Sequence, residues 1–352
     1  MKEWLFILLF SVLLMGCVED SITSPPFENC LYFEIPAWDY SDNHFFVDTI
    51  YANRNSLNIF SKYYHNAVPY LISYYRIKKI EVWRSHTGLL SPDERRANSF
   101  VDLKARAKDG YKAEKEIFSN TISGKQNLDG RCIMLEENND YIINRNVGLI
   151  SFINPLEDTR LVAVSYTIEG PSSSNLDDIQ YGDFISDINL PSEERLVLKL
   201  VKDYDINSSD KSLWNKRLKN IYRLPINTFE PGDLEINICM LKDEKMVDEI
   251  IIENKKVALN TLFGVDLTDE TYTSSEPDGK FDFLPGKTFF PETGDIIFPA
   301  LEPFGKDLPA ELPITYKNNK IYNSAKYQVQ SQTNRFFIRC KYKVAGNHLT
   351  KF

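Results

Sequence analysis

The amino-acid sequence predicts a mainly β fold, organised as two β-sandwich-like modules with a few short helices. Three observations support this prediction: apolar and polar residues alternate over several short segments, turn residues separate these segments, and helical periodicity is brief. Alternation with a period of two places one face of each strand in a core, as in antiparallel sheets. The chain has 352 residues, of which 43% are hydrophobic, so it can build one large domain or two ordinary ones.

The N-terminus has the features of a bacterial secretory leader. An apolar run covers residues 4–15, which is shorter than the roughly 20 residues that a membrane-spanning helix needs. Residues 1–16 are therefore predicted to be a signal peptide. The tetrad Leu14-Met15-Gly16-Cys17 resembles a lipobox, in which the cysteine becomes lipidated and N-terminal after cleavage. We expect lipidated Cys17 to anchor the chain to the outer membrane, because buried acyl chains hold a polar chain at a bilayer surface.

Residues 17–69 are expected to form a lipidated tether followed by an aromatic-rich segment. Aromatic residues are dense over residues 38–75, where Tyr63-Tyr64 and Tyr74-Tyr75 stand in pairs. Exposed rings in this segment would favour a glycan-binding surface. Packing in the core is the alternative, because aromatic residues are also common strand formers.

The predicted strands fall into two groups. Module 1, over residues 70–185, contains alternating segments at 80–83 and 162–168, and module 2, over residues 190–346, contains those at 196–200, 234–240 and 336–344. Helical periodicity is limited to residues 211–222, after the possible cap Ser209-Asp210, and to residues 257–263, which Gly264 would end. The boundary between the modules is placed at residues 190–195, because the Pro/Ser/Asn/Asp-rich segment 171–178 leads to it.

Composition argues against several classes of function. The formal charge of -9 would repel a phosphate backbone, so no nucleic acid partner is expected. Four His and five Cys, with no C-x-x-C motif, offer little material for a metal centre, and neither a metal nor a cofactor is predicted. With Cys17 lipidated, the other cysteines permit two disulfides in three connectivities or four separate buried thiols; these cysteines are Cys30, Cys132, Cys239 and Cys340.

No catalytic residue is predicted. The sequence contains no G-x-S-x-G elbow, no phosphate-binding P-loop and no H-E-x-x-H pair. The four histidines lie far apart and have no close carboxylate companion in the sequence: His44, His65, His86 and His348. A triad assembled in space is the alternative, and a His hydrogen-bonded to a carboxylate inside a deep pocket would favour a hydrolase.

One acidic loop could offer oxygen atoms to calcium. Asp278 and Asp282 flank a turn at Gly279, within the segment Pro277-Asp278-Gly279-Lys280-Phe281-Asp282-Phe283. The loop lacks the ligand spacing of an EF-hand and its closing Glu. A plain turn between Phe-bearing strands is therefore the preferred interpretation.

Two ordered series of short motifs extend over residues 70–346. The first begins with Tyr75-Arg76-Ile77, continues with Ile80-Glu81-Val82-Trp83, and ends with Leu161-Val162-Ala163-Val164-Ser165-Tyr166. The second, which is more specific, includes the Pro277 to Phe283 segment and Gly294-Asp295-Ile296-Ile297-Phe298-Pro299, followed by Leu301-Glu302-Pro303-Phe304-Gly305. In this order the motifs resemble the N-terminal region of the SprA family of outer-membrane gliding-motility and type IX secretion proteins.

The resemblance implies a non-enzymatic protein-binding module of secretion or motility machinery. SprA-like proteins are much longer and close a large membrane barrel, which this chain is too short to supply at about ten residues per strand. The chain is therefore expected to be a stand-alone copy of the non-barrel region, held by its own lipid at the periplasmic or the cell-surface face. The alternatives are a surface lipoprotein that binds glycan through an aromatic patch and a truncated SprA fragment without function.

Overall fold

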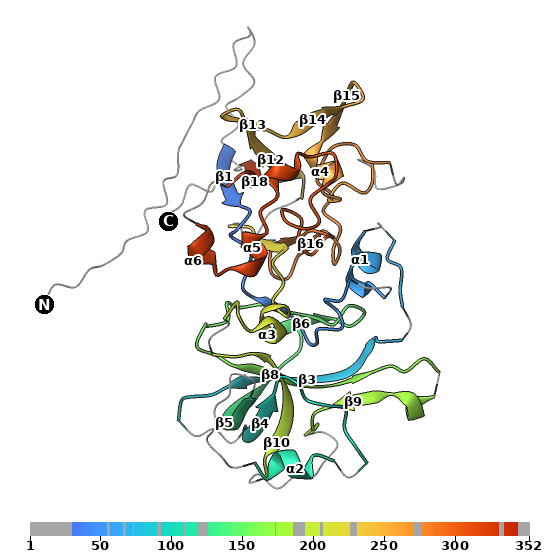
Figure 1. Cartoon of the computed structure of the whole chain (residues 1–352), viewed down its shortest axis with the longest axis vertical. Coiled ribbons are helices and arrows are strands. Elements are labelled where there is room, and N and C mark those ends of the chain that lie inside the picture. The colour runs from blue at the N-terminus through green and yellow to red at the C-terminus, as the bar shows by residue number, and fades with distance from the viewer. Residues whose placement is uncertain are drawn as a thin grey trace, which may run out of the picture.

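The structure is a computed structural model, which describes residues 30–343 apart from residues 55–56, 66–67, 73, 90–92, 109, 118–125, 173, 186–193, 205–206, 226–230, 270–275 and 331–333. The predicted signal peptide, residues 1–16, lies outside the described residues, and so does Cys17. The elements form two units stacked along the long axis of the molecule (Figure 1). Within the described residues, none of the helices has the length and apolar character needed to cross a membrane.

The lower unit in Figure 1 is built on a sheet in the order β10-β4-β5-β3-β8-β9. Strand β8 also pairs with β10, so five of the strands close into a small barrel. Strand β10 is parallel to β4 and antiparallel to β8. The strands are β3 (Ile77–Ser85), β4 (Glu94–Phe100), β5 (Gln126–Leu135), β8 (Val162–Ile168), β9 (Ile179–Tyr181) and β10 (Leu196–Lys202).

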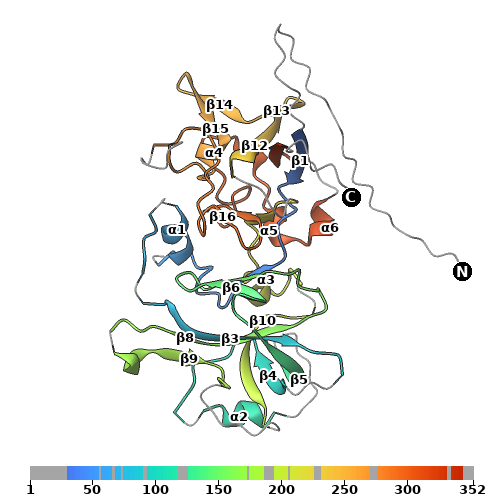
Figure 2. The same cartoon turned by 180° about the vertical axis from the view of Figure 1, so that it is seen from behind.

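A three-stranded sheet in the order β2-β7-β6 packs on the barrel. Its strands are β2 (His44–Phe46), β6 (Tyr141–Asn144) and β7 (Leu149–Phe152). Buried residues of this sheet share one hydrophobic cluster with Val82 and Val164 of the barrel and with helix α1 (Ile59–Tyr64). This sheet and helix α3 (Lys211–Trp214) lie at the junction of the two units in both views (Figures 1 and 2).

The upper unit contains a four-stranded antiparallel sheet, a three-stranded sheet and a hairpin. The first has the order β1 (Cys30–Pro36), β18 (Phe336–Lys343), β12 (Leu234–Lys242) and β13 (Lys245–Val247). The second has the order β11 (Ile221–Arg223), β17 (Asp295–Ile297) and β16 (Phe289–Phe290), and the hairpin pairs β14 (Glu249–Ile252) with β15 (Lys255–Ala258).

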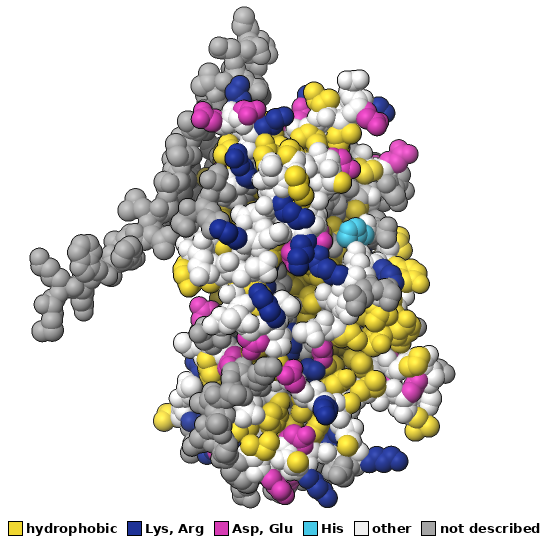
Figure 3. Space-filling view, in the orientation of Figure 1, with side chains coloured by type: hydrophobic (Ala, Val, Ile, Leu, Met, Phe, Trp, Pro, Cys, Tyr) yellow, Lys and Arg dark blue, Asp and Glu magenta, His cyan; other side chains and the backbone are white. Residues whose placement is uncertain are grey.

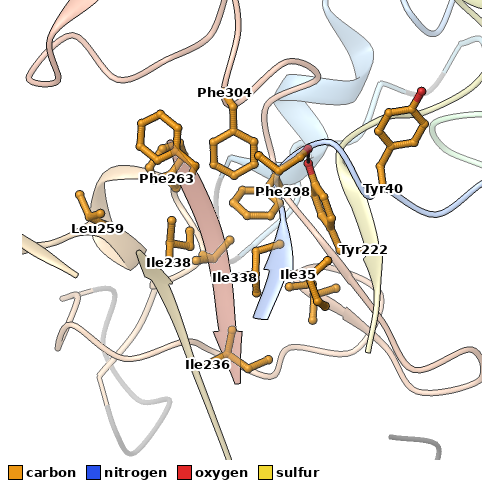
Figure 4. Close-up of a cluster of buried hydrophobic side chains, with 14 of the residues drawn as sticks. Ile35, Tyr40, Tyr222, Ile236, Ile238, Leu259, Phe263, Phe298, Phe304 and Ile338 are labelled. Atoms are coloured by element: carbon orange, nitrogen blue, oxygen red, sulfur yellow. Dashed lines mark hydrogen bonds between the residues drawn. The ribbon is translucent and has the colours of Figure 1, made fainter. Parts of the chain in front are cut away.

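The core of the upper unit lies between its large sheet and a group of aromatic rings. Figure 4 shows isoleucines of β1, β12 and β18 beside the rings of Phe263, Phe298 and Phe304. The ring centroids of Phe298 and Phe304 are 5.3 Å apart in an edge-to-face arrangement. Such edge-to-face pairs add about 0.5–1.5 kcal/mol to the free energy gained from burial.

The remaining helices are short. The α-helices are α2 (Lys112–Lys115), α4 (Leu259–Leu262), α5 (Lys320–Asn323) and α6 (Lys326–Val329), and the 3-10 turns are η1 (Asn175–Asp177), η2 (Pro231–Asp233) and η3 (Ile314–Tyr316). Helix α4 lies within the predicted segment 257–263, whose first two residues instead end β15, and Gly264 comes after the helix with a φ of 70°. The prediction for residues 211–222 is wrong beyond Trp214: Asp210 caps α3 by accepting the N–H of Ser212, but the chain enters β11 at Ile221.

The mainly β prediction is confirmed, with two differences in how the strands are arranged. The first sheet is a closed barrel instead of a sandwich. The predicted segments 17–69, 70–185 and 190–346 also do not match the pairing, because β1 pairs with β18 of the upper unit and β10 completes the lower barrel. Alternation shows that a segment has a buried face, but it does not identify the strand with which it pairs.

Candidate functional site at the junction of the two units

The histidines and cysteines considered in the sequence lie in different parts of the molecule. Cys17 and His348 fall outside the described residues. His65 and His86 lie near the surface, and the ring nitrogens of each make hydrogen bonds only to residues within four positions of it among those described. Of the four histidines, only His44 lies in the protein interior within the described part of the chain.

The acidic loop of Asp278 and Asp282 forms a hydrogen-bonded turn. The carboxylate of Asp282 accepts the backbone N–H groups of Leu267 and Thr268 at 2.5 and 2.8 Å, and Asp278 accepts that of Lys280 at 2.8 Å. These oxygens therefore stabilise the local backbone, as the plain-turn interpretation expects. No group of three or more His, Cys, Asp or Glu side chains in the described part of the chain could hold a metal ion.

The aromatic-rich segment contributes most of its rings to the core. Six of them are at most 2% exposed: Tyr40, Phe45, Phe46, Tyr51, Phe60 and Tyr64. Tyr70 and Tyr74 remain exposed, at 63% and 38%. The alternative of core packing thus accounts for these six rings, and a broad glycan-binding platform over residues 38–75 does not fit their burial.

The cysteines of the described residues are separate thiols. Cys30 is partly buried, and Cys132, Cys239 and Cys340 are buried, with no disulfide between them. Burial raises the pKa of Cys132 to about 12 and that of Cys239 to about 11, and it raises the pKa of Cys340 further. Thiols with such raised pKa values are poor nucleophiles, so they belong to the core and not to a reactive site.

A buried chain of polar side chains joins the two units. Nδ1 of His44 lies 2.8 Å from the hydroxyl of Ser151, and its Nε2 lies 3.2 Å from Oδ2 of Asp295. The guanidinium of Arg223 donates to both carboxylate oxygens of Asp295, at 3.0 and 3.2 Å. The ring of His44 thus presents Nε2 to the carboxylate of Asp295 and Nδ1 to the hydroxyl of Ser151.

Strand register places these groups together. His44 of β2 lies directly opposite Ser151 of β7, and Asp295 of β17 lies opposite Arg223 of β11. His44 and Asp295 are both fully buried, and Ser151 is only 2% exposed. Burial alone would raise the pKa of Asp295, but the contacts with His44 and Arg223 outweigh it and lower the pKa to about 2. Asp295 is therefore a buried carboxylate whose charge is compensated from both units.

In hydrolases, a Ser–His–Asp series supplies a nucleophile, its general base and the group that orients the base. The burial and backbone setting of Ser151 decide whether it can act as such a nucleophile. Ser151 borders an open cleft of about 460 Å³, yet its side chain is 2% exposed. It also lies in the middle strand of its sheet, with β2 on one side and β6 on the other, so its backbone N–H lies in the ladder and not in an oxyanion hole. The arrangement ties the units together through buried polar contacts, and it leaves little access for a substrate carbonyl.

The sequence does not predict this series of buried polar contacts, because its residues are distant from one another in the sequence. Asp295 does lie within the motif Gly294-Asp295-Ile296-Ile297-Phe298, where Gly294 has a φ of 68° and Ile296 and Phe298 enter the upper core. A carboxylate between such apolar residues was the one available signal, because a charged group in a buried strand needs a partner.

Buried lysines form a second group near the junction. Lys199, Lys202, Lys216 and Lys219 are each less than 10% exposed. Lys199 pairs with Asp48 at 2.5 Å, and the other three ammonium groups donate to backbone carbonyls. Burial lowers the pKa of Lys202 and Lys216 to about 8 and that of Lys219 to about 7. These lysines were not predicted, because surface solvation is the ordinary expectation for Lys.

A group of exposed apolar side chains lies on the surface of the part of the chain that the structure describes. It follows α1 and approaches the β8–β9 hairpin, and Figure 3 shows apolar side chains gathered over the segment between α1 and β3. Hydrogen bonds from the N–H of Tyr75 to Glu169 and from Lys78 to Asn175 bring the two segments together. We define the apolar surface as Val68, Tyr70, Leu71, Tyr74, Leu176 and Ile179, which are between 38% and 96% exposed.

A scan against protein-family models finds no match for this chain, and a search of curated proteins finds no significant match. The likeness to the SprA family is therefore carried by the ordered motifs alone.

Proposed function

We propose that the protein is a non-enzymatic lipoprotein, held at the outer membrane by a lipid on Cys17, that binds a protein of secretion or gliding-motility machinery. The leader and the lipobox-like tetrad support the anchor. The ordered SprA-like motifs support the class of partner. The interior supports a binding role over catalysis, because the one Ser–His–Asp arrangement of the described residues is enclosed.

The observation that carries the proposal is the apolar surface. Leu71 is 57% exposed and Leu176 is 96% exposed, so water contacts side chains that ordinarily lie in a core. Burying such area against a partner yields about 25 cal/mol per Å². Tyrosines such as Tyr70 are frequent anchors in protein interfaces, because a large ring is buried at a small cost in side-chain entropy.

Site-specific photo-crosslinking in intact cells tests the partner. A photoreactive phenylalanine in place of Tyr70 should crosslink a protein of the secretion or motility machinery, identified by mass spectrometry. The same replacement at Tyr327, which is 73% exposed on α6, is the matched control and should not capture that protein. The proposal is wrong if position 70 captures no such component and a deletion strain secretes and glides normally. Capture of polysaccharide at position 70 would also overturn it.

Metabolic labelling with palmitate tests the anchor. The label should be lost from Cys17→Ala and retained in Cys30→Ala, whose cysteine lies in β1. The variant without the lipid should also leave the membrane fraction, because the acyl chains supply the binding energy. A label that survives Cys17→Ala disproves the lipid assignment.

A further inference from the structure

Five cationic side chains line a cleft at the junction. Its volume is about 510 Å³, which lies within the range of small-molecule sites. Helix α3 and the segment after it, the loop after β2 and the turn before α5 form its walls. Its charged residues are Arg54, Lys211, Arg217, Lys219, Lys306 and Glu302. The cleft therefore has five cationic residues, although the whole chain has a net charge of -9.

Part of this positive charge is neutralised on one wall. Arg54 pairs with Asp307, and its second nitrogen lies 3.1 Å from Glu302. Lys306 lies 3.7 Å from the same oxygen of Glu302. The backbone N–H of Glu302 also donates to Asp307 at 2.8 Å. Two cations and two carboxylates therefore balance on this side of the cleft.

The opposite wall keeps an excess of positive charge. Arg217 pairs with Asp42 at 3.1 Å, whereas Lys211 has no ion-pair partner among the described residues. Lys219 is 6% exposed, and its ammonium donates to the carbonyls of Trp214 and Arg217 at 2.8 and 3.0 Å. Three cations thus share one carboxylate, which also pairs with Lys326 at 2.6 Å, so this wall keeps about two positive charges or more when Lys219 is protonated.

Two cations on this wall have donors without an oxygen acceptor among the described residues. An ammonium has three N–H groups; two carbonyl oxygens accept from Lys219, and its Nζ also lies 4.5 Å from the centroid of the Trp214 ring. The Nε atom of Arg217 is buried without a hydrogen-bond partner. A buried donor without an acceptor costs about 1–3 kcal/mol, so a ligand oxygen that reaches both groups would be bound favourably.

We propose that this cleft binds a small molecule through a phosphate group, with Lys219, Arg217 and Lys211 as its contacts. A phosphate monoester carries between one and a half and two negative charges at about pH 7, which matches the excess on this wall. It also offers three acceptor oxygens, which suit an ammonium and a guanidinium together. The site is separate from the apolar surface, so the two proposals can fail independently.

Binding should be coupled to proton uptake. Burial and the neighbouring Arg217 lower the pKa of Lys219 to about 7, so only part of the ammonium is charged near neutrality. The other groups acting on it are Lys211, which disfavours the charge, and Glu302 and Asp42, which favour it. A bound dianion raises the pKa of Lys219 and draws a proton from the buffer.

Calorimetric titration of the full chain in detergent micelles at pH 7 tests the proposal. The probe is glycerol 3-phosphate, with glycerol as the neutral comparison, in two buffers of different ionisation enthalpy. We expect saturable binding of the phosphate compound only, with a fraction of a proton taken up. Micelles that contain phosphatidic acid should compete if the cleft also accepts a lipid headgroup. Lack of competition would identify a soluble phosphate as the ligand class.

Three variants distinguish binding in the cleft from non-specific binding to surface charge. Lys219→Met keeps the apolar stem and should weaken binding about tenfold or more and abolish proton uptake. Lys211→Gln, on the short helix α3, should weaken binding about two- to fivefold without removing proton uptake, and it keeps the test valid if Lys219→Met does not fold. Lys245→Gln, in the exposed strand β13, should change nothing. No saturation up to about 10 mM, or equal loss in Lys245→Gln, would overturn the proposal.

Discussion

Replacing Asp295 by Asn removes the negative charge at the centre of the polar chain that joins the units. The side chain is fully buried, and burial alone would raise its pKa, but His44 and Arg223 lower that pKa to about 2. The ordinary pKa of an Asp is 3.8. This difference corresponds to about 2 kcal/mol of unfolding free energy that the charged carboxylate contributes at neutral pH.

The sign of the pH dependence follows from the lowered pKa. The contribution of Asp295 is complete above about pH 4, where the carboxylate of the unfolded chain is also ionised. It is lost as the pH falls towards 2, because the native carboxylate must then bind a proton. The difference in unfolding free energy between the unaltered chain and Asp295→Asn should therefore narrow by about 2 kcal/mol between pH 5 and pH 2.

Urea unfolding of the full chain in detergent micelles, followed by the fluorescence of the buried Trp83 and Trp214, measures this difference. Asp243→Asn is a matched control, because this exposed turn residue has a φ of 48°, which Asn tolerates. The control should follow the unaltered chain at each pH. A difference for Asp295→Asn that stays constant from pH 5 to pH 2 would show that the pKa of Asp295 is not lowered in the native state, and the reasoning would be refuted.

Three further predictions concern the core. Ser151→Ala should lower the unfolding free energy by about 1–2 kcal/mol, because Nδ1 of His44 loses its partner, and should leave p-nitrophenyl acetate hydrolysis unchanged; a fall in hydrolysis would point to catalysis instead. Gly148→Ala should cost about 2 kcal/mol or more in urea unfolding, because the glycine has a φ of 58° and an added Cβ would overlap the ring of Tyr51; an unchanged midpoint would contradict this packing. Maleimide labelling in denaturant without reductant should modify all four cysteines of the described residues, Cys30, Cys132, Cys239 and Cys340, whereas protection of any pair would reveal a disulfide.

Much of the secondary structure could be predicted because its signals are local. Leu234, Ile236 and Ile238 alternate with more exposed residues and form β12 with that face buried. Gly264 follows helix α4 because glycine adopts a positive φ without steric cost. The segment after Trp214 departs from its helical pattern, since Ile221 and Tyr222 gain more by pairing with β17 than by extending a short helix. In this strand Tyr222 packs in the upper core and Ile221 in the lower one.

The candidate sites could not be predicted in the same way. His44 and Asp295 meet only because β2 and β17 lie on either side of the junction. Likewise, Lys219 lines the cationic cleft together with Arg54 and Lys306, which come from distant parts of the chain. The spacing of residues in the sequence does not predict that these side chains lie close together, because charge compensation depends on distances in space.

By itself, the sequence determined that this protein is mainly β, that its N-terminus has the pattern of a lipoprotein leader, and which faces of its strands are apolar. The tertiary structure decided which strands pair, that the lower sheet closes into a barrel, and that β1 belongs to the upper unit. The physical reason is that backbone preference and apolar periodicity act over neighbouring residues. Strand pairing and the neutralisation of buried charge are settled only when distant segments compete for the same core.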